Sequence, residues 1–270
     1  MFRIGYNYMI NILQKKALIL AVRAGEIMLK SGAEIYRVED TIERICKACG
    51  ISYVEVFATP TGLFVSVDNG DDNSDVYTYV KRIRSGADTN LEKISQINHF
   101  SREFTTTDLS IDQGMKRMKA IDKHKLHPMP IRLLGAALIA SCFAQLFGGN
   151  VLDICCAFVI GGASYIVSLI LRKFEINYFI RAFCCCAISA FCALLCTEVI
   201  ATTNYNAIII GSIMIFVPGV AITNSIRDFL SGDMLSGIAR LTEAFIIAIA
   251  LATGAGVILK IWGSIGGIII

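Results

Sequence analysis

The chain has 270 residues, a net charge of +3 and a mean hydropathy of +0.62, with 55% apolar residues. This hydropathy is high for a soluble protein, and so small a net charge gives no support for nucleic-acid binding. The charge is uneven, because residues 1–132 carry 19 Lys/Arg and 16 Asp/Glu whereas the rest carry six of each. The sequence therefore predicts a soluble domain, residues 1–127, followed by a membrane domain, residues 128–270.

The N-terminal domain is expected to be a small α/β or α+β unit. Apolar periodicity and β-branched runs predict the following elements in order: helices over 15–31 and 33–49, strands over 53–58, 63–67 and 76–83, and helices over 88–100 and 110–123. Gly32 is the expected stop of the first helix, and Asp68-Asn69-Gly70 predicts a turn between two strands. Asp88 is the expected cap of the third helix, and Ser110 opens a capping box for the fourth.

The membrane domain is expected to be an α-helical multi-pass bundle. A helix needs about 20 mostly apolar residues to cross a bilayer. Five runs meet that length, at approximately 131–148, 151–171, 179–199, 206–226 and 240–260. Asp153 and Glu198 fall near the ends of the second and third runs, where the expectation is contact with interfacial water.

The distribution of Lys and Arg predicts the orientation of the membrane domain. Cations occur before the first span and in the second and fourth loops, and the first and third loops have none. Under the positive-inside rule, the N-terminal domain faces the cytoplasm and the C-terminus faces outward. The predicted location is a plasma (bacterial inner) membrane.

The fourth span is interrupted by Pro218 and Gly219. Proline cannot donate a backbone hydrogen bond, so the carbonyl of Met214 needs another partner. Transporters often place such broken helices at the substrate site, and an ordinary proline kink is an equally good interpretation.

Polar residues gather directly after this break. Asn224, Arg227 and Asp228 follow it, and Arg240 and Glu243 open the fifth span, three residues apart and able to pair. Either arginine can bind a carboxylate through two hydrogen bonds, although positive-inside anchoring also explains both of them.

No catalytic, metal or cofactor site is predicted. Cys46 and Cys49 form a single CxxC with no second pair in the soluble part, and His124 and His127 are closer than zinc-binding histidines usually are. The cysteines of the apolar runs are expected to pack as small apolar side chains. The chain also has no phosphate-binding loop, which leaves ATP-driven transport without support.

The sequence resembles the threonine/serine exporter (ThrE-like) family over nearly its whole length. The segments that carry the resemblance are residues 24–39, 59–62, 97–102, 218–228, 232, 237 and 240–244. Within the N-terminal segments, the residues that match the family's motifs are Gly32, Glu34, Arg37, Glu39, Pro60, Thr61, Gly62, Asn98 and Arg102. Long members look like two membrane halves in one chain, and this chain looks like the larger subunit of the split branch (YjjP-like).

The resemblance implies export of small metabolites rather than an enzymatic reaction. It implies threonine and serine as substrates for some members and dicarboxylates such as succinate for the split branch, with transport driven by the proton-motive force. The implied partners are the lipid bilayer and a small membrane protein of the same family (YjjB-like) that supplies the second half.

Two other functions stay open. A membrane-anchored enzyme would use polar side chains of the N-terminal domain such as Glu34, Arg37, Glu39, Thr61 and Arg102. A metabolite sensor in that domain would gate export. In the exporter hypothesis, the carboxylate of the substrate meets Arg227 or Arg240, the break at Pro218–Gly219 and Asn224 contact it, and Asp228 or Glu243 carries a coupled proton.

Overall fold

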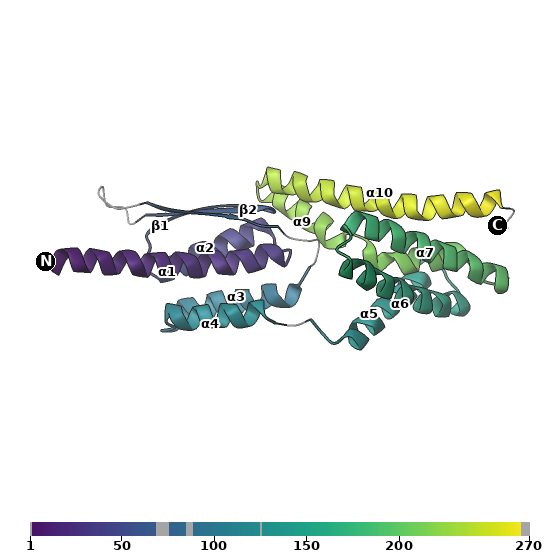
Figure 1. Cartoon of the computed structure of the whole chain (residues 1–270), viewed down its shortest axis with the longest axis horizontal. Coiled ribbons are helices and arrows are strands. Elements are labelled where there is room, and N and C mark those ends of the chain that lie inside the picture. The colour runs from purple at the N-terminus through teal and green to yellow at the C-terminus, as the bar shows by residue number, and fades with distance from the viewer. Residues whose placement is uncertain (1, 69–75, 85–88, 125, 266–270) are drawn as a thin grey trace. The chain divides into compact units, whose positions relative to one another are not determined.

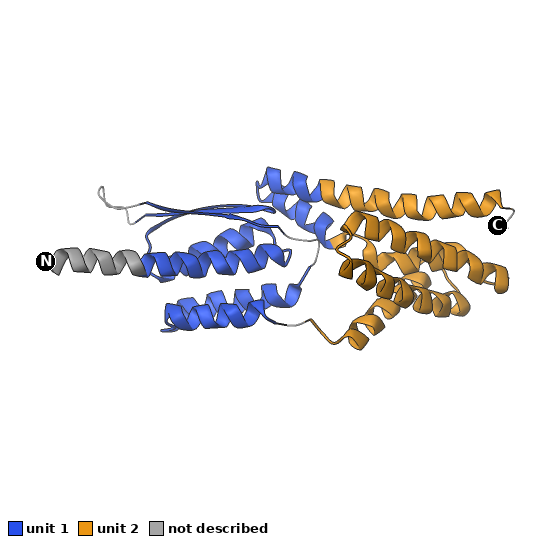
Figure 2. Ribbon diagram, in the orientation of Figure 1, with its two compact units in different colours: residues 1–125, 220–241 blue, residues 126–219, 242–270 orange. Residues whose placement is uncertain are grey.

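The computed structural model of the chain describes residues 2–68, 76–84, 89–124 and 126–265, and the side chains from Leu13 onward (Figure 1). Residues 69–75, which include most of the predicted hairpin turn, and the predicted cap Asp88 lie outside this part of the chain. The chain divides into two compact units (Figure 2). The first contains residues 1–125 and 220–241, and the second contains residues 126–219 and 242–270.

The first unit joins the N-terminal elements to part of the C-terminal half. Its elements are α1 (Phe2–Lys30), α2 (Ile35–Ala48), β1 (Tyr53–Thr59), β2 (Gly62–Asp68), β3 (Tyr77–Arg82), α3 (Leu91–Thr106), α4 (Ile111–Asp122), nearly all of α9 (Gly219–Leu230) and the start of α10 (Met234–Ser264). Helices α1 and α2 form the middle of three layers (Figure 1). The sheet packs on one side of these two helices, and α3 and α4 pack on the other. The sequence predicted a small unit of either α/β or α+β class, and the antiparallel sheet makes it α+β.

The core of this unit lies between the sheet and the two central helices. Apolar side chains of α1 and α2 such as Leu20 and Ile42 are fully buried against Leu63 and Val65 of β2. The strands pair antiparallel in the order β1-β2-β3. Since side chains alternate along a strand, the opposite face of the sheet carries the exposed residues.

Helix ends follow their predicted signals with one correction. Gly32 takes a φ of +82°, and the Ala33 N–H donates to the Met28 carbonyl, so α1 ends in a Schellman turn as predicted. The predicted capping box of α4 is also present. The cap of α3 is Asn90 rather than Asp88, because the Asn90 side chain accepts the Lys93 N–H, and the helix continues to Thr106.

The second unit is a bundle of apolar helices: α5 (Met129–Leu146), α6 (Val151–Lys173), α7 (Tyr178–Val199), α8 (Tyr205–Ile213), the 3-10 turn η1 (Met214–Phe216) and most of α10. In the part of the chain that the structure describes, four helices are long and apolar enough to cross a membrane. Residues 205–216, which form α8 and η1, are followed after a 58° bend by α9. If these two bent segments are counted as one span, the described part of the chain has five. Helix α10 begins at Met234, six residues before the predicted start of the last span.

The break after η1 satisfies its own backbone. The Val217 N–H donates to the Met214 carbonyl at 3.3 Å, and the Tyr178 hydroxyl donates to the Phe216 carbonyl at 3.3 Å. The carbonyl that proline was expected to leave free is therefore taken by a 3-10 contact. No water-filled cavity is needed to explain this backbone.

Asp153 is a structural residue rather than an interfacial one. Its side chain is buried, and its two carboxylate oxygens accept the backbone N–H groups of Asn150 and Asn204 at 2.8 and 2.7 Å. Asn150 also donates to the Thr202 carbonyl. The expectation of contact with water is therefore wrong for Asp153, which ties two loops of the bundle together.

Glycines set how closely the spans approach. A Cβ atom on Gly161 would lie 2.3 Å from the Cβ of Ala140, and one on Gly254 would lie 2.5 Å from the Phe183 carbonyl oxygen. Gly256, two residues later on α10, has no neighbour within 4 Å. Small residues of the spans therefore allow close helix packing at Gly161 and Gly254, but not at Gly256.

We expect Gly254→Ala to destabilise the protein by about 1–3 kcal/mol, because the added methyl must push α7 and α10 apart. The matched control is Gly256→Ala on the same helix, which adds a methyl in open space. Thermal unfolding in detergent, followed by size-exclusion chromatography, measures both. Equal melting temperatures for the two variants would contradict the close approach at Gly254.

Candidate functional site

Six of the residues singled out from the sequence meet at the turn between α1 and α2. Gly32 and Glu34 belong to this turn, and Asn224, Arg227, Asp228 and Arg240 reach it from α9 and α10. We call this set, with Ala33 and Ile35, the Gly32–Ile35 junction. All of its residues lie in the first unit, so two segments separated by nearly two hundred residues form one site.

The first turn of α2 has no cap of its own. Glu34 occupies the N-cap position without a side-chain hydrogen bond to the helix, and the first turn carries no acidic residue. Asp228 supplies both missing features, because its Oδ1 accepts the Ile35 N–H at 3.1 Å and its negative charge lies at the positive end of the helix. Asp228 therefore caps α2 from a distant part of the sequence.

The two carbonyl groups before this helix also find partners in the C-terminal half. Asn224 Nδ2 donates to the Gly32 carbonyl at 2.8 Å, and Arg240 Nη2 donates to the Ala33 carbonyl at 2.6 Å. Polar backbone groups that leave water need such bonds. As a result, three of the four residues of the turn, Gly32, Ala33 and Ile35, are each bound through their backbone.

A carboxylate between two guanidinium groups completes the junction. Glu34 is buried, and its carboxylate accepts a hydrogen bond from Arg227 and lies 3.3 Å from Nε of Arg37. The side chain of Arg227 is 50% exposed. Another carboxylate can therefore reach Arg227 from solvent, while the buried Glu34 keeps Arg37 as a partner.

Arg240 stands in a different environment, because it is buried with Asp228. Its Nε lies 3.1 Å from Oδ2 of Asp228, close enough for an ion pair but not aligned for a hydrogen bond. Neither atom has a hydrogen-bond partner among the described residues. The predicted pairing of Arg240 with Glu243 is replaced by this longer-range pair, which neutralises two charges that would be costly to bury alone.

Glu39 lies one turn further along α2, close enough to Asp228 and Asp233 for their charges to act on its carboxyl. Burial raises the pKa of its carboxyl, and the charges of Asp233 and Asp228 raise it further. The Ala58 N–H donates to Glu39 Oε1 at 2.8 Å and acts in the opposite direction. This hydrogen bond ties α2 to β1.

The remaining motif residues lie elsewhere. Pro60 and Thr61 form the tight turn between β1 and β2, which the pairing of Thr59 with Gly62 closes. Among the described residues, Asn98 and Arg102 of α3 make no hydrogen bond to the junction, and their carbonyls accept from side chains of their own helix.

The break residues and Glu243 belong to the second unit. Pro218 and Gly219 stand between η1 and α9, and Glu243 is half-buried on α10. The sequence reasoning missed the backbone groups of Ala33 and Ile35. The sequence does indicate that the start of α2 needs partners from elsewhere, because its N-cap position holds no Ser, Thr, Asp or Asn.

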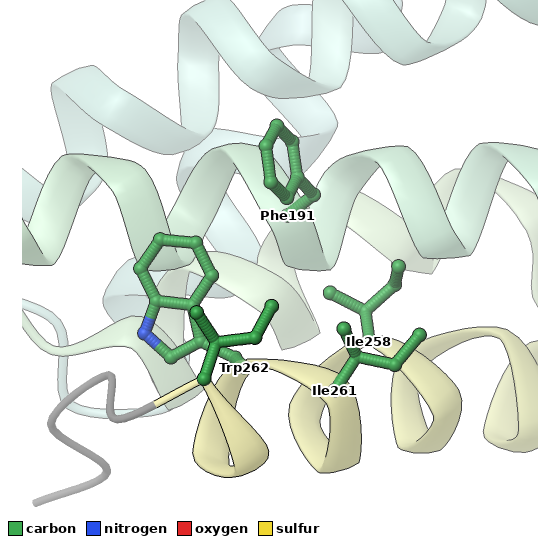
Figure 3. Close-up of a pocket in the computed structure, with 5 residues that line it drawn as sticks. Phe191, Ile258, Ile261 and Trp262 are labelled. Carbon is green, nitrogen blue, oxygen red and sulfur yellow. The ribbon is translucent and has the colours of Figure 1, made fainter.

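A hollow in the second unit is unsuited to a charged substrate. Phe191 of α7 and Ile258, Ile261 and Trp262 of α10 line it together with Ile265, and the rings of Phe191 and Trp262 meet edge to face at 6.0 Å (Figure 3). Its lining is apolar, and no charged group belongs to it. A zwitterion or a dianion would find no partner there.

The cysteine pair of α2 is held in the thiol form. Burial raises the pKa of Cys46 to about 12 and that of Cys49 to about 11. In the described part of the chain, no three His, Cys, Asp or Glu side chains are grouped in a way that would hold a metal ion.

Comparison with known proteins gives a consistent family. Residues 19–262 match the sequence profile of the ThrE family, described as "Putative threonine/serine exporter". The "Probable threonine/serine exporter" of Mycobacterium tuberculosis is 25% identical over 89% of this chain, which spans 45% of that protein's length. The "Probable succinate transporter subunit YjjP" of Escherichia coli is 25% identical over 93% of this chain and 96% of its own. No solved structure matches the chain.

We expect Asp228→Asn to destabilise the protein by about 3–5 kcal/mol, because it leaves the buried Arg240 guanidinium without a counter-charge. Arg240→Gln should cost a similar amount. The double variant should lose less than the sum of the two, by at least about 1 kcal/mol, because the charges depend on each other. Unfolding by titration with sodium dodecyl sulfate measures each variant.

The matched control for these single and double variants is the pair of Asp40 and Arg44, which is exposed and one turn apart on α2. Substituting either residue should change stability by no more than about 0.5 kcal/mol. Additive losses at Asp228 and Arg240 would show that the two residues are not coupled.

We expect Glu39→Gln to stabilise the protein at pH 7, and the gain should disappear on acidification. The raised pKa means that the folded state holds the proton of Glu39 more tightly than the unfolded state does. The contribution of Glu39 is therefore favourable below its unfolded pKa and is lost as the pH rises through the folded pKa. Glutamine removes the charge and can still accept the Ala58 N–H.

The measurement is the difference in melting temperature between variant and parent, followed from pH 7 to pH 4. Glu55→Gln, on the exposed side of β1, is the control and should show a small difference throughout. A Glu39→Gln variant that is less stable than the parent at pH 7 would refute the prediction.

Proposed function

This chain belongs to the ThrE family, and we propose that it is one subunit of a secondary exporter of small carboxylates or amino acids. Its relatives are named as transporters and transporter subunits, and its own apolar helices make it a multi-pass membrane protein. Membership of a transporter family also speaks against an enzyme. The proposed substrate class, threonine and serine or a dicarboxylate such as succinate, rests on the names of those relatives.

The subunit proposal rests on how much of each relative's length this chain covers. The chain spans nearly all of a protein named as a subunit and about half of one named as a whole exporter. Transporter folds commonly place their substrate site between two related halves. The partner would therefore be a small membrane protein of the same family (YjjB-like) that supplies the other half.

The proposed orientation places residues 1–125 in the cytoplasm and the C-terminus outside. Its support is the alternation of cationic and cation-free loops, with Arg132 before α5, and Arg172, Lys173 and Arg181 between α6 and α7. The protein would lie in a plasma (bacterial inner) membrane, with the Gly32–Ile35 junction toward the cytoplasmic side.

Arg227 is the residue that we propose meets the carboxylate of the substrate. Arg240 is a weaker choice, because its guanidinium is buried and already occupied by Asp228 and the Ala33 carbonyl. Arg227 is half exposed and holds only the carboxylate of Glu34 among the described residues. A substrate carboxylate would replace Glu34 on Arg227 while Glu34 keeps Arg37.

The broken helix supplies the other proposed contacts. Pro218 and Gly219 interrupt the helix before α9, and Asn224 lies one and a half turns further on. Glu243, half-buried on α10, and Asp228 are the proposed carriers of a coupled proton. Both are carboxylates removed in part from water, where the neutral form becomes accessible.

A regulatory role for the N-terminal elements is a second candidate, and the junction favours it. The turn between α1 and α2 is bound directly by residues of α9 and α10. A metabolite that changes the position of α2 would therefore act on helices that continue into the membrane. Saturable binding of threonine, serine or succinate to the intact protein, retained in an Arg227→Gln variant, would support such a sensor.

We expect export to require both chains and to require Arg227. The parent chain is expressed alone and with its small partner in cells that lack their own exporters, and threonine, serine and succinate are followed inside and outside the cells. Selective loss of one solute from cells with both chains is the expected result. Arg227→Gln should reduce that export by about tenfold or more, because glutamine carries no charge to hold a carboxylate.

The control is Arg44→Gln, which removes an exposed arginine of α2 that pairs only with Asp40 among the described residues. This variant should export as the parent does, with equal amounts of protein in the membrane. Full export by this chain alone would refute the two-subunit proposal. Unchanged export by Arg227→Gln would remove Arg227 from the substrate site.

A further inference from the structure

Helix α9 and the first two turns of α10 form a hairpin with inverted polarity. The side chains that face into the first unit are polar: Asn224, Ser225 and Asp228 of α9, and Ser236 and Arg240 of α10. A helix on the surface of a soluble protein does the opposite and buries its apolar side. The interior of this hairpin is therefore built to bind the polar turn of residues 32–35.

The turn of the hairpin is compact and well defined. Gly232 takes a φ of +91°, and the Asp233 N–H donates to the Asp228 carbonyl at 2.8 Å, which ends α9 in a Schellman turn. The backbone carbonyl of Asp233 then accepts the Gly237 N–H at the start of α10. Gly237 lies against the ring of Phe229, where an added Cβ would be 2.9 Å from ring carbons. The two helices are thus fixed to each other with little freedom to rotate.

Because the polar side faces inward, a row of apolar residues faces outward. We call it the outer face of the hairpin, and it consists of Ile226, Leu230, Met234, Leu235, Ile238 and Leu241. These side chains are between 45% and 84% exposed. Full burial of one such side chain is worth about 1.5–3 kcal/mol, and large exposed apolar patches are rare on soluble monomers. Water is therefore an unfavourable neighbour for this face.

The occupant that fits this face is the acyl-chain region of a bilayer. Helix α10 continues without a break into an apolar window with a mean hydropathy of 2.3, and exposed residues such as Phe245 and Ile249 extend the outer face along it. The 31 residues of α10 are about 46 Å long, which exceeds the roughly 30 Å of a hydrocarbon core. The first turns of α10 therefore reach the boundary layer of the same bilayer.

The charges of the hairpin are compatible with that depth. Asp228 and Arg240 face inward and neutralise each other, and Asp233 is half-buried in the turn between the two helices, so the six residues of the outer face carry no charge. Arg227 lies at the side of α9 with a half-exposed, flexible side chain. Its guanidinium is paired with Glu34, so α9 brings no unpaired charge into the boundary layer.

We propose that the outer face of the hairpin is embedded in lipid at the bilayer boundary. Helix α9 is then a lipid-facing support on which the turn between α1 and α2 rests. This assignment concerns the lipid contact of the hairpin, and it holds whichever solute the protein moves.

Quenching of tryptophan fluorescence by brominated lipid tests the proposal. Trp262 is the single tryptophan of the chain, so Trp262→Phe gives a silent background. Into it, Ile226→Trp, Leu230→Trp and Leu235→Trp are introduced one at a time. The intact protein is reconstituted into phosphatidylcholine–phosphatidylglycerol vesicles with or without bromine at carbons 6 and 7 of the acyl chains. These bromines report rings about 5–10 Å below the head groups.

Two matched positions calibrate the measurement. Val257→Trp, on the exposed side of α10 within its apolar window, must be quenched in every correctly inserted sample. Leu91→Trp, at the exposed start of α3, gives the value for a ring in water. We expect quenching on the outer face to exceed that at position 91 by roughly twofold or more, as for a helix buried at the interface.

Quenching at positions 226, 230 and 235 that equals the value at position 91, in samples where position 257 is quenched, would overturn the proposal. The same low quenching together with a blue-shifted emission would show that another protein chain covers the face, which also overturns it. The Leu230→Trp variant guards against misfolding, because that side chain is 84% exposed and a larger ring there disturbs no packing.

Discussion

The start of α2 is the constraint around which the first unit is organised. A helix begins with N–H groups that have no partner inside it, and in this protein the local sequence offers no side chain to accept the first of them. Asp228, 193 residues later, accepts it, and Asn224 and Arg240 bind the two carbonyls that precede it. A change at either end of this arrangement leaves buried polar groups on both.

The same arrangement gives the four charged residues of the junction different tasks. Asp228 and Arg240 are buried, and their mutual attraction compensates for the loss of water around them. Glu34 is buried too, but its partner Arg227 is half exposed and can reach another carboxylate from solvent. The proposed contact with the substrate belongs to the second pair, and the first pair holds the turn and the two C-terminal helices together.

Much of the architecture follows from the sequence because it depends on local patterns. The spans of α5, α6 and α7 follow from hydropathy, and the ends of α1 and α4 follow from Gly32 and the Ser110 capping box. The predicted last span, approximately 240–260, lies within α10, which begins at Met234. Arg240 is a helical residue whose charge is neutralised by Asp228, so it sets no boundary.

The pairing at the junction was beyond local reasoning. Nothing near Glu34 indicates that Arg227 will contact it, since periodicity and capping rules describe neighbours within one helix. The cap of α3 shows the same limit on a smaller scale, because Asp88 and Asn90 are both acceptable caps by type. Only the backbone geometry of the finished fold selects Asn90. The sequence singled out six residues of the junction but not their contacts, and it missed the backbone groups of Ala33 and Ile35.

The distance between the two halves of the junction also governs how the protein is made. A ribosome adds about 5–20 residues per second, so the start of α2 waits roughly 10–40 seconds for Asp228 to be synthesised. During that interval α5, α6, α7 and α8 are synthesised. The first unit can therefore be completed only after the helices that precede α9 have left the ribosome.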